Sequence, residues 1–167
     1  MIDNWAALDV ATPGLVLDLA VLDSNLDEMS RIAKEARVEL YPHAKTHRMS
    51  EVGRRQIARG ADGLCVAKLG EAEAFAAAGI GRLFVANPIV GEQKASRALA
   101  LSRTVDLLLA TDSADAARTI GPTFADAGTR ARVLLAIDSG LGREGVSPDR
   151  APEIAQAIAA VPGVELV

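Results

Sequence analysis

Apolar strand-like runs alternate with helix-like segments along this chain of 167 residues, and this alternation constrains the fold more than any other feature. The unit repeats at roughly 25 residues with short connections, which is typical of parallel strands joined by helical crossovers. The clearest strand-like runs are residues 63–67, 83–86, 105–110 and 132–137. We therefore expect an α/β protein with a parallel sheet.

Weaker strand-like runs extend the pattern at both ends. Residues 15–19 and 38–42 are expected to be strands, and a last strand is expected to begin at Val164. Between the first two strands, Leu22, Leu26, Met29, Ile32 and Ala33 recur at helical spacing. Further helices are expected over residues 50–59, 70–78 and 92–102.

Two more helices are expected to begin at recognisable caps. Residues 111–113 precede a helical pattern that reaches about residue 127. Ser147 followed by Pro148 has the composition of an N-cap and a proline at the first helical position, before a helix that reaches about residue 160.

Two architectures produce such a repeat: a doubly wound open sheet and a (β/α)₈ barrel. A complete barrel takes about 250 residues. The chain is therefore expected to be a portion of a longer protein, cut before barrel closure, since it stops within a strand and would leave a parallel edge exposed.

Composition excludes several classes of protein. Net charge is −4 and no basic run is interleaved with aromatic residues, so nucleic-acid binding is not expected. No apolar run is long enough to cross a membrane. Residues 1–5 lack the basic and apolar regions of a secretory signal. A single cysteine, Cys65, forms no internal disulfide and fits a reducing cytoplasm, so we expect a cytoplasmic protein.

The segment Tyr-Pro-His-Ala-Lys-Thr-His at residues 41–47 holds both histidines of the chain. If the segment is extended, alternate side chains place His43, Lys45 and His47 on one side. A lysine at the end of a parallel strand, beside imidazoles, is a candidate for Schiff-base chemistry.

Other polar residues follow the strands, where ligands bind in both architectures. Lys68 is a competing Schiff-base lysine, and Asn87 follows the next strand. His43 and His47 alone make an incomplete metal site, so no metal site is expected in this chain. Cys65 is expected to be a small core residue rather than a nucleophile.

Residues 140–145 match the dinucleotide-binding pattern G-x-G-x-x-G, and Glu165 lies where a ribose-binding acid is expected. In that motif the helix opens within the glycines. Here the expected cap, Ser147, comes after them. The dinucleotide alternative remains open but is disfavoured.

The segment at residues 42–47 resembles the P-H-x-K-T-H motif of the D-threonine aldolase and D-serine dehydratase family. These are fold-type III pyridoxal-phosphate enzymes with a barrel domain like that of alanine racemase. Residues 67–73 (AKLGEAE), 86–91 (ANPIVG) and 137–143 (IDSGLGR) agree with the family in order, and Thr12-Pro13 is also usual there. Tyr41, Arg48, Ser139 and Glu144 depart from its usual pattern.

The resemblance implies a fold: residues 1–167 are the N-terminal portion of a pyridoxal-phosphate-binding TIM barrel of the alanine racemase N-terminal type. It also implies residue roles. Lys45 would form the internal aldimine and exchange protons at the substrate α-carbon. Arg143 would lie beside the cofactor ring, His43 and His47 would line the same face, and Asn87 the rim.

The implied reaction is cleavage of a D-β-hydroxy amino acid to glycine and an aldehyde, or dehydration of D-serine. The resemblance further implies a β-rich domain beyond Val167 that supplies phosphate-binding loops and ligands for a divalent metal, and a homodimer. Two alternatives share the fold: a non-catalytic pyridoxal-phosphate carrier and an amino-acid racemase.

Overall fold

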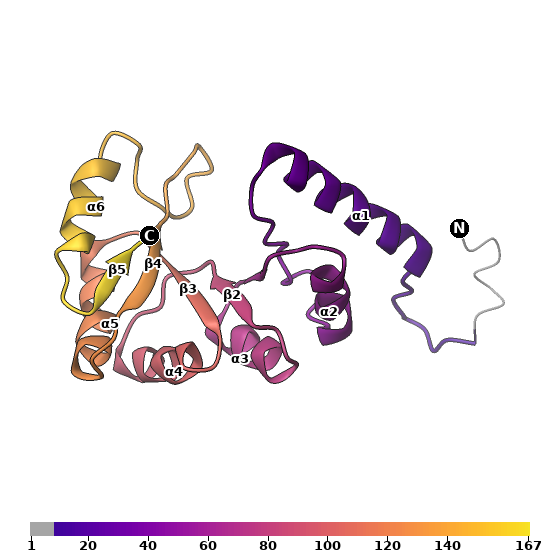
Figure 1. The fold of residues 1–167 in the computed structure, drawn as a ribbon, viewed down its shortest axis with the longest axis horizontal. Coiled ribbons are helices and arrows are strands. Elements are labelled where there is room, and N and C mark those ends of the chain that lie inside the picture. Colours follow the sequence, from indigo (N-terminus) through magenta and orange to yellow (C-terminus); the bar gives the residue numbers. More distant parts are fainter. Residues whose placement is uncertain (1–8) are drawn as a thin grey trace.

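The structure is a computed structural model that describes residues 9–167; the expectation about residues 1–5 lies outside them. Five parallel strands form one sheet in the order β1-β2-β3-β4-β5, with helices between them (Figure 1). The elements are α1 (Leu19–Ala36), α2 (Ser50–Ala58), β1 (Leu64–Val66), α3 (Leu69–Ala77), β2 (Arg82–Val85), α4 (Glu92–Ser102), β3 (Asp106–Thr111), α5 (Ala114–Asp126), β4 (Ala131–Leu135), α6 (Ala151–Ala159) and β5 (Val164–Leu166).

The α/β class and the parallel sheet are confirmed. Each strand pairs only with its neighbour in sequence, so every connection is a crossover through a helix. This order is that of a barrel wall, whereas a doubly wound sheet reverses its strand order partway.

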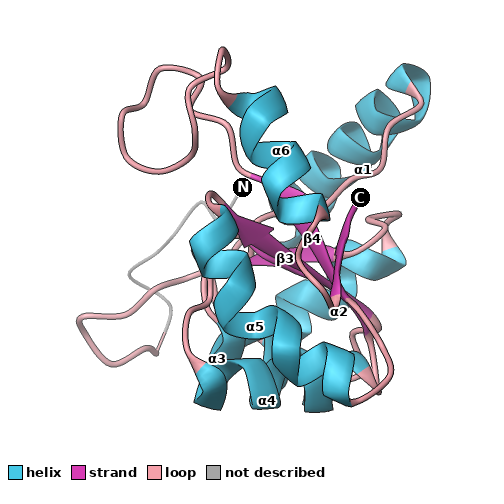
Figure 2. Cartoon of the chain, turned by 90° about the vertical axis from the view of Figure 1, so that its left-hand side faces the viewer, coloured by secondary structure: helices cyan, strands magenta, loops and turns pink. Residues whose placement is uncertain are grey.

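Helices α3 to α6 cover one face of the sheet, and the other face stays concave and partly open (Figures 1 and 2). Side chains on the covered face, such as Leu83, Val85 and Val133, are fully buried. Their neighbours in the strands, Phe84 and Arg132, point to the concave face and are half-buried. A one-sided helical layer over a curved parallel sheet is the wall of an unclosed barrel.

The segment at 38–42 lies beside β1 but is not a regular strand. The Asp62 amide donates to Leu40 O (2.9 Å) and the Cys65 amide to Pro42 O (3.0 Å). Within the part of the chain that the structure describes, its only ladder contact is an isolated parallel bridge between His43 and Cys65. The segment thus extends the sheet past β1 without regular pairing.

The expected strand at residues 15–19 is wrong. Leu15 is fully exposed, and α1 already begins at Leu19. A strand needs a hydrogen-bonding neighbour, and within residues 9–167 none lies beside this segment. Instead Asp18 caps α1, accepting from the Ala20 amide at 3.0 Å.

The expected cap at Ser147 is also wrong. The Arg150 amide donates to Ser147 O (3.0 Å), which forms a turn, and α6 begins only at Ala151. Ser113, by contrast, is the N-cap of α5 as predicted, and its hydroxyl accepts from the Ala116 amide at 3.1 Å.

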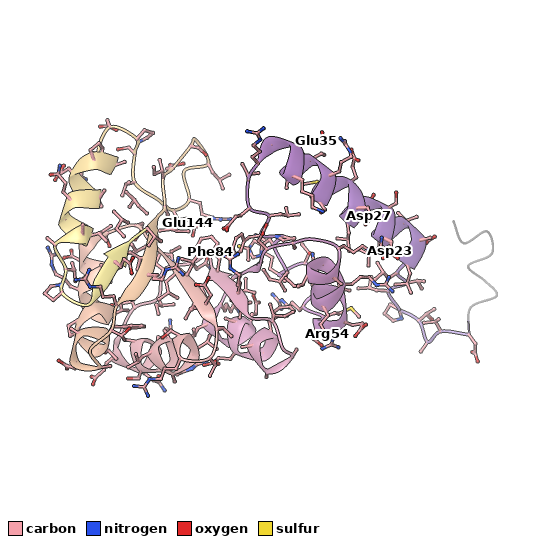
Figure 3. All side chains as sticks on the ribbon, in the orientation of Figure 1. Asp23, Asp27, Glu35, Arg54, Phe84 and Glu144 are labelled. Carbon is pink, nitrogen blue, oxygen red and sulfur yellow. The ribbon has the colours of Figure 1, made fainter. Side chains whose placement is uncertain are left out.

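Ion pairs hold α1 to α2, on the side of α1 where Figure 3 labels Asp23 and Asp27. Asp23 pairs with Arg55 (2.6 Å) and Arg59 (2.7 Å), and Asp27 pairs with Arg59. Among the described helices, none has the length and apolar character needed to cross a membrane.

Candidate functional site

The lysine segment is a tight turn rather than an extended strand. Residues 44–47 form the turn, which the Arg48 amide closes by donating to Ala44 O at 2.9 Å. The prediction that alternation aligns His43, Lys45 and His47 is therefore wrong. The turn begins at the sheet, where the Ala44 amide donates to Cys65 O at 2.8 Å.

His43 lies at the start of the turn in the same register layer as Cys65 and Phe84. The Lys45 amide donates to Nδ1 of His43 at 3.4 Å. Burial lowers the pKa of His43, and the nearby Lys45 ammonium lowers it further. The ring is therefore neutral at neutral pH and adds no positive charge beside Lys45.

Lys45 is exposed at the carboxyl end of the β1 edge. Within residues 9–167 its ammonium makes no ion pair. The nearby Cys65 thiol is buried, and burial raises its pKa to about 11, although the Lys45 charge opposes the shift. Cys65 is thus a poor nucleophile, as the sequence predicted.

His47 closes the turn on the side of α2. Its Nδ1 accepts from the Met49 amide at 3.1 Å. Its ring meets Phe75 of α3 edge to face, with centroids 6.3 Å apart. Burial lowers the pKa of His47, while the neighbouring Gln56 side chain acts in the opposite direction.

Lys68 and Asn87 are exposed at the carboxyl ends of β1 and β2. Both line a cavity of about 870 Å³, together with Arg48, Lys94 and Arg97. Neither Lys45 nor His43 lines this cavity, and α3 contributes much of its wall. The cavity therefore neighbours the lysine turn but does not contain it.

Glu71, in the first turn of α3, is a site residue that the sequence did not indicate. Its Oε2 accepts from the Ala67 amide at 2.8 Å, and its Oε1 lies 3.4 Å from Nε of Arg48. Arg48 has a left-handed backbone (φ 49°), which is uncommon for a residue other than glycine. Glu71 thus ties the end of the lysine segment to the end of β1.

The loop after β4 carries Arg143. The carboxylate of Asp138 accepts from the Gly140 and Gly142 amides at 2.9 and 3.0 Å, and these bonds lower the pKa of Asp138. Arg143 is exposed and pairs with the labelled Glu144 at 2.7 Å (Figure 3).

The same loop contradicts the dinucleotide alternative. Residues 140–145 form irregular structure, and the next helix, α6, begins six residues after Gly145, at Ala151. The motif therefore offers no helix N-terminus to a pyrophosphate.

Across residues 9–167, no three His, Cys, Asp or Glu side chains lie close enough to hold a metal ion. Of the predicted site residues, the folded chain brings His43 and Lys45 together, beside Cys65, at one edge of the sheet. Asn87 and Arg143 lie at the ends of other strands.

The chain is similar in sequence and in fold to several known proteins. The chain is 39% identical over 156 residues to a D-threonine aldolase from Arthrobacter sp, a match covering 93% of this chain and 41% of that protein. It is 34% identical over 152 residues to a D-threo-3-hydroxyaspartate dehydratase from Delftia sp. (strain HT23), covering 91% and 40%. The crystal structure of a D-threonine aldolase from Filomicrobium marinum superposes with a TM-score of 0.89 at 35% identity, covering 95% of this chain and 43% of that one.

These matches confirm the resemblance to D-threonine aldolase and the fold expected from it. The chain spans about two fifths of the length of the curated relatives it matches. Residues 17–167 match the family model described as the alanine racemase N-terminal domain. Because this match extends over nearly the whole chain, the protein belongs to the alanine racemase N-terminal domain family.

Proposed function

We propose that this chain carries the lysine of a pyridoxal-phosphate lyase that acts on D-β-hydroxy amino acids. One observation carries the proposal: Lys45, in the P-H-x-K-T-H segment, is exposed at the carboxyl end of the parallel sheet and has no ion-pair partner among the described residues. An imine-forming lysine must be accessible and free to lose its proton. Relatives named as aldolases and a dehydratase support the lyase class.

The residues around Lys45 fit this cofactor. His43 is neutral, and Cys65 and Phe84 offer a buried and a half-buried surface in the same register layer. Pyridoxal phosphate needs a lysine at a barrel mouth and a mixed apolar and polar wall. When bound, it supplies an electron sink for charge at the substrate α-carbon.

The proposed roles follow from position. Lys45 holds the cofactor and exchanges a proton at the substrate α-carbon, since its flexible stem carries a group that can give and take protons. His43 keeps the Lys45 backbone in place through Nδ1. Arg143 faces the cofactor ring after exchanging its present partner Glu144. Asn87 belongs to the rim.

The remainder of the proposed protein lies outside residues 1–167. We propose that further strands close the barrel, and that a β-rich domain supplies the phosphate loops and the ligands of a divalent metal. We also propose a homodimer, and a cytoplasmic location because the single cysteine suits a reducing compartment.

The test is turnover by the full-length protein supplied with pyridoxal phosphate and Mn²⁺. D-threonine, D-serine and D-3-hydroxyaspartate are offered, with their L-enantiomers as stereochemical controls. Glycine plus aldehyde indicates aldol cleavage, and ammonia plus a keto acid indicates dehydration. Lys45→Ala should abolish turnover, whereas Lys34→Ala, on the exposed end of α1, should leave it intact.

If none of the D-amino acids reacts, the lyase proposal fails. Cofactor attachment without turnover would then indicate a carrier. Interconversion of D- and L-alanine would indicate a racemase.

A further inference from the structure

Three side-chain atoms in the described residues are buried without a hydrogen-bond partner, and two of them belong to neighbouring side chains. These are Nε2 of His47 and Oε1 of Gln56. Buried polar groups in native proteins nearly always find partners. Two such groups at one place therefore call for an explanation.

The protonation state of His47 follows from its other nitrogen. The Met49 amide donates to Nδ1 at 3.1 Å, so Nδ1 carries a lone pair. A neutral imidazole has one N–H, which must then be on Nε2. Nε2 is therefore a donor and Oε1 of the neighbouring Gln56 is an acceptor, so the two orphaned atoms are chemically complementary.

The packing around the ring leaves His47 little freedom. Phe75 of α3 meets its edge at 76° between planes. Gly53 of α2 makes room for Phe75, since a Cβ at residue 53 would lie 2.9 Å from the Phe75 ring. The imidazole therefore sits between two helices that are themselves packed together.

Anchoring of His47 also restrains Lys45, because both residues belong to the same turn and that turn is held at both ends. The sheet holds its start, through Ala44 and Cys65. His47 holds its end against α2. Lys45 lies between these anchors, so its backbone is held in place.

We propose that His47 is a positioning residue, which as the Nε2–H tautomer donates to Gln56, accepts from Met49, and so orients Lys45 toward the cofactor. This proposal rests on the proposed function. In this proposal His47 acts on the turn that carries Lys45. The resemblance had instead implied that His47 lines the cofactor site.

Substitutions of Gln56 separate a hydrogen-bond role from simple filling of space. Gln56→Leu keeps the volume but removes the acceptor, and Gln56→Glu keeps an acceptor. The rate at which pyridoxal phosphate attaches to Lys45 is read by borohydride trapping near pH 8.5. We expect Gln56→Leu to slow attachment about tenfold and Gln56→Glu to restore most of the rate.

A space-filling role predicts the reverse order, because the apolar leucine suits a buried position better than a carboxylate. Gln93→Leu on the exposed face of α4 is the matched control and should attach at the unsubstituted rate. Attachment by Gln56→Leu at the unsubstituted rate would overturn the proposal.

A second readout does not involve the cofactor. The chain has two histidines, so ¹⁵N NMR resolves both rings. We expect the His47 ring in the Nε2–H form and slow exchange of the Met49 amide, with exchange faster in Gln56→Leu. A His47 ring protonated on Nδ1 would contradict the proposal. If the unsubstituted protein takes no cofactor, the proposed function fails, and this NMR result still decides the role of His47 in the turn.

Discussion

At the scale of single residues, the proposed site combines neutral imidazoles with one lysine. Burial is the main cause that lowers the pKa of both His43 and His47. Both rings are therefore uncharged at the neutral pH at which Lys45 is proposed to act. A protonated His47 would also lose its acceptor for the Met49 amide, since both ring nitrogens would then carry hydrogen.

The lowered histidine pKa values predict a stability that depends on pH. In the unfolded chain a histidine has its ordinary pKa of 6.5, above its folded value. The unfolded state therefore binds more protons as the pH falls below 6.5, and the free energy of unfolding should fall with it. Urea denaturation at about pH 7.5 and about pH 5.5 measures this, in a window above the range where carboxylates titrate.

His47→Gln is the control for this pH dependence, because it removes one of the two titrating groups. Its free energy of unfolding should fall less between the two pH values. A free energy of unfolding that stays constant or rises toward pH 5.5 would contradict the assignment of both rings as buried and neutral.

Cys65 should be unreactive in the folded protein. Burial raises its pKa to about 11, so little thiolate exists at pH 8, and the thiolate is the reactive form. Iodoacetamide should label Cys65 only after denaturation, as read by intact mass. Rapid labelling of the folded protein would show that the thiol is open to solvent.

At the scale of elements, the sequence predicted the helices and strands whose positions depend on a local apolar pattern. The strand β1 is buried along its whole length, and β2, β4 and β5 bury side chains such as Leu83, Val133 and Val164, so apolar composition marked these runs. Residues 15–19 have similar composition but no neighbour, because pairing rather than composition makes a strand. The turn at 44–47 escaped prediction because the hydrogen bond from Arg48 to Ala44 has no sequence signature.

The same limit applies to the candidate site. Lys45 could be predicted as a candidate because its motif can be read directly from the sequence. Glu71 was missed because its importance depends on bonds to Ala67 and Arg48, which only the folded chain brings near.

Close packing of α5 on the turn that precedes β5 gives a prediction about Gly121. A Cβ at residue 121 would lie 2.4 Å from Pro162 O and 2.9 Å from Val161 Cγ1. Gly121→Ala should therefore lower the free energy of unfolding by about 1–3 kcal/mol, as measured by urea denaturation. Gly81→Ala is the matched control, because nothing lies within 4 Å of the added methyl group. Equal stability of the two variants would mean that α5 sits farther from this turn.

At the scale of the whole molecule, a one-sided helical layer and a concave inner face place the strand carboxyl ends along one rim (Figures 1 and 2). Lys45, Asn87 and Arg143 all follow strands or strand-like segments at that rim. The match to the alanine racemase N-terminal domain covers the same wall. We therefore propose that this wall presents Lys45 to pyridoxal phosphate.

Borohydride reduction after addition of pyridoxal phosphate, followed by peptide mass mapping, tests that claim most directly. The chain has four lysines, Lys34, Lys45, Lys68 and Lys94, so the labelled peptide identifies the residue. The measurement is made on the full-length protein. We expect the label on Lys45. Label on Lys68 in its place, or no label on any lysine, would contradict it.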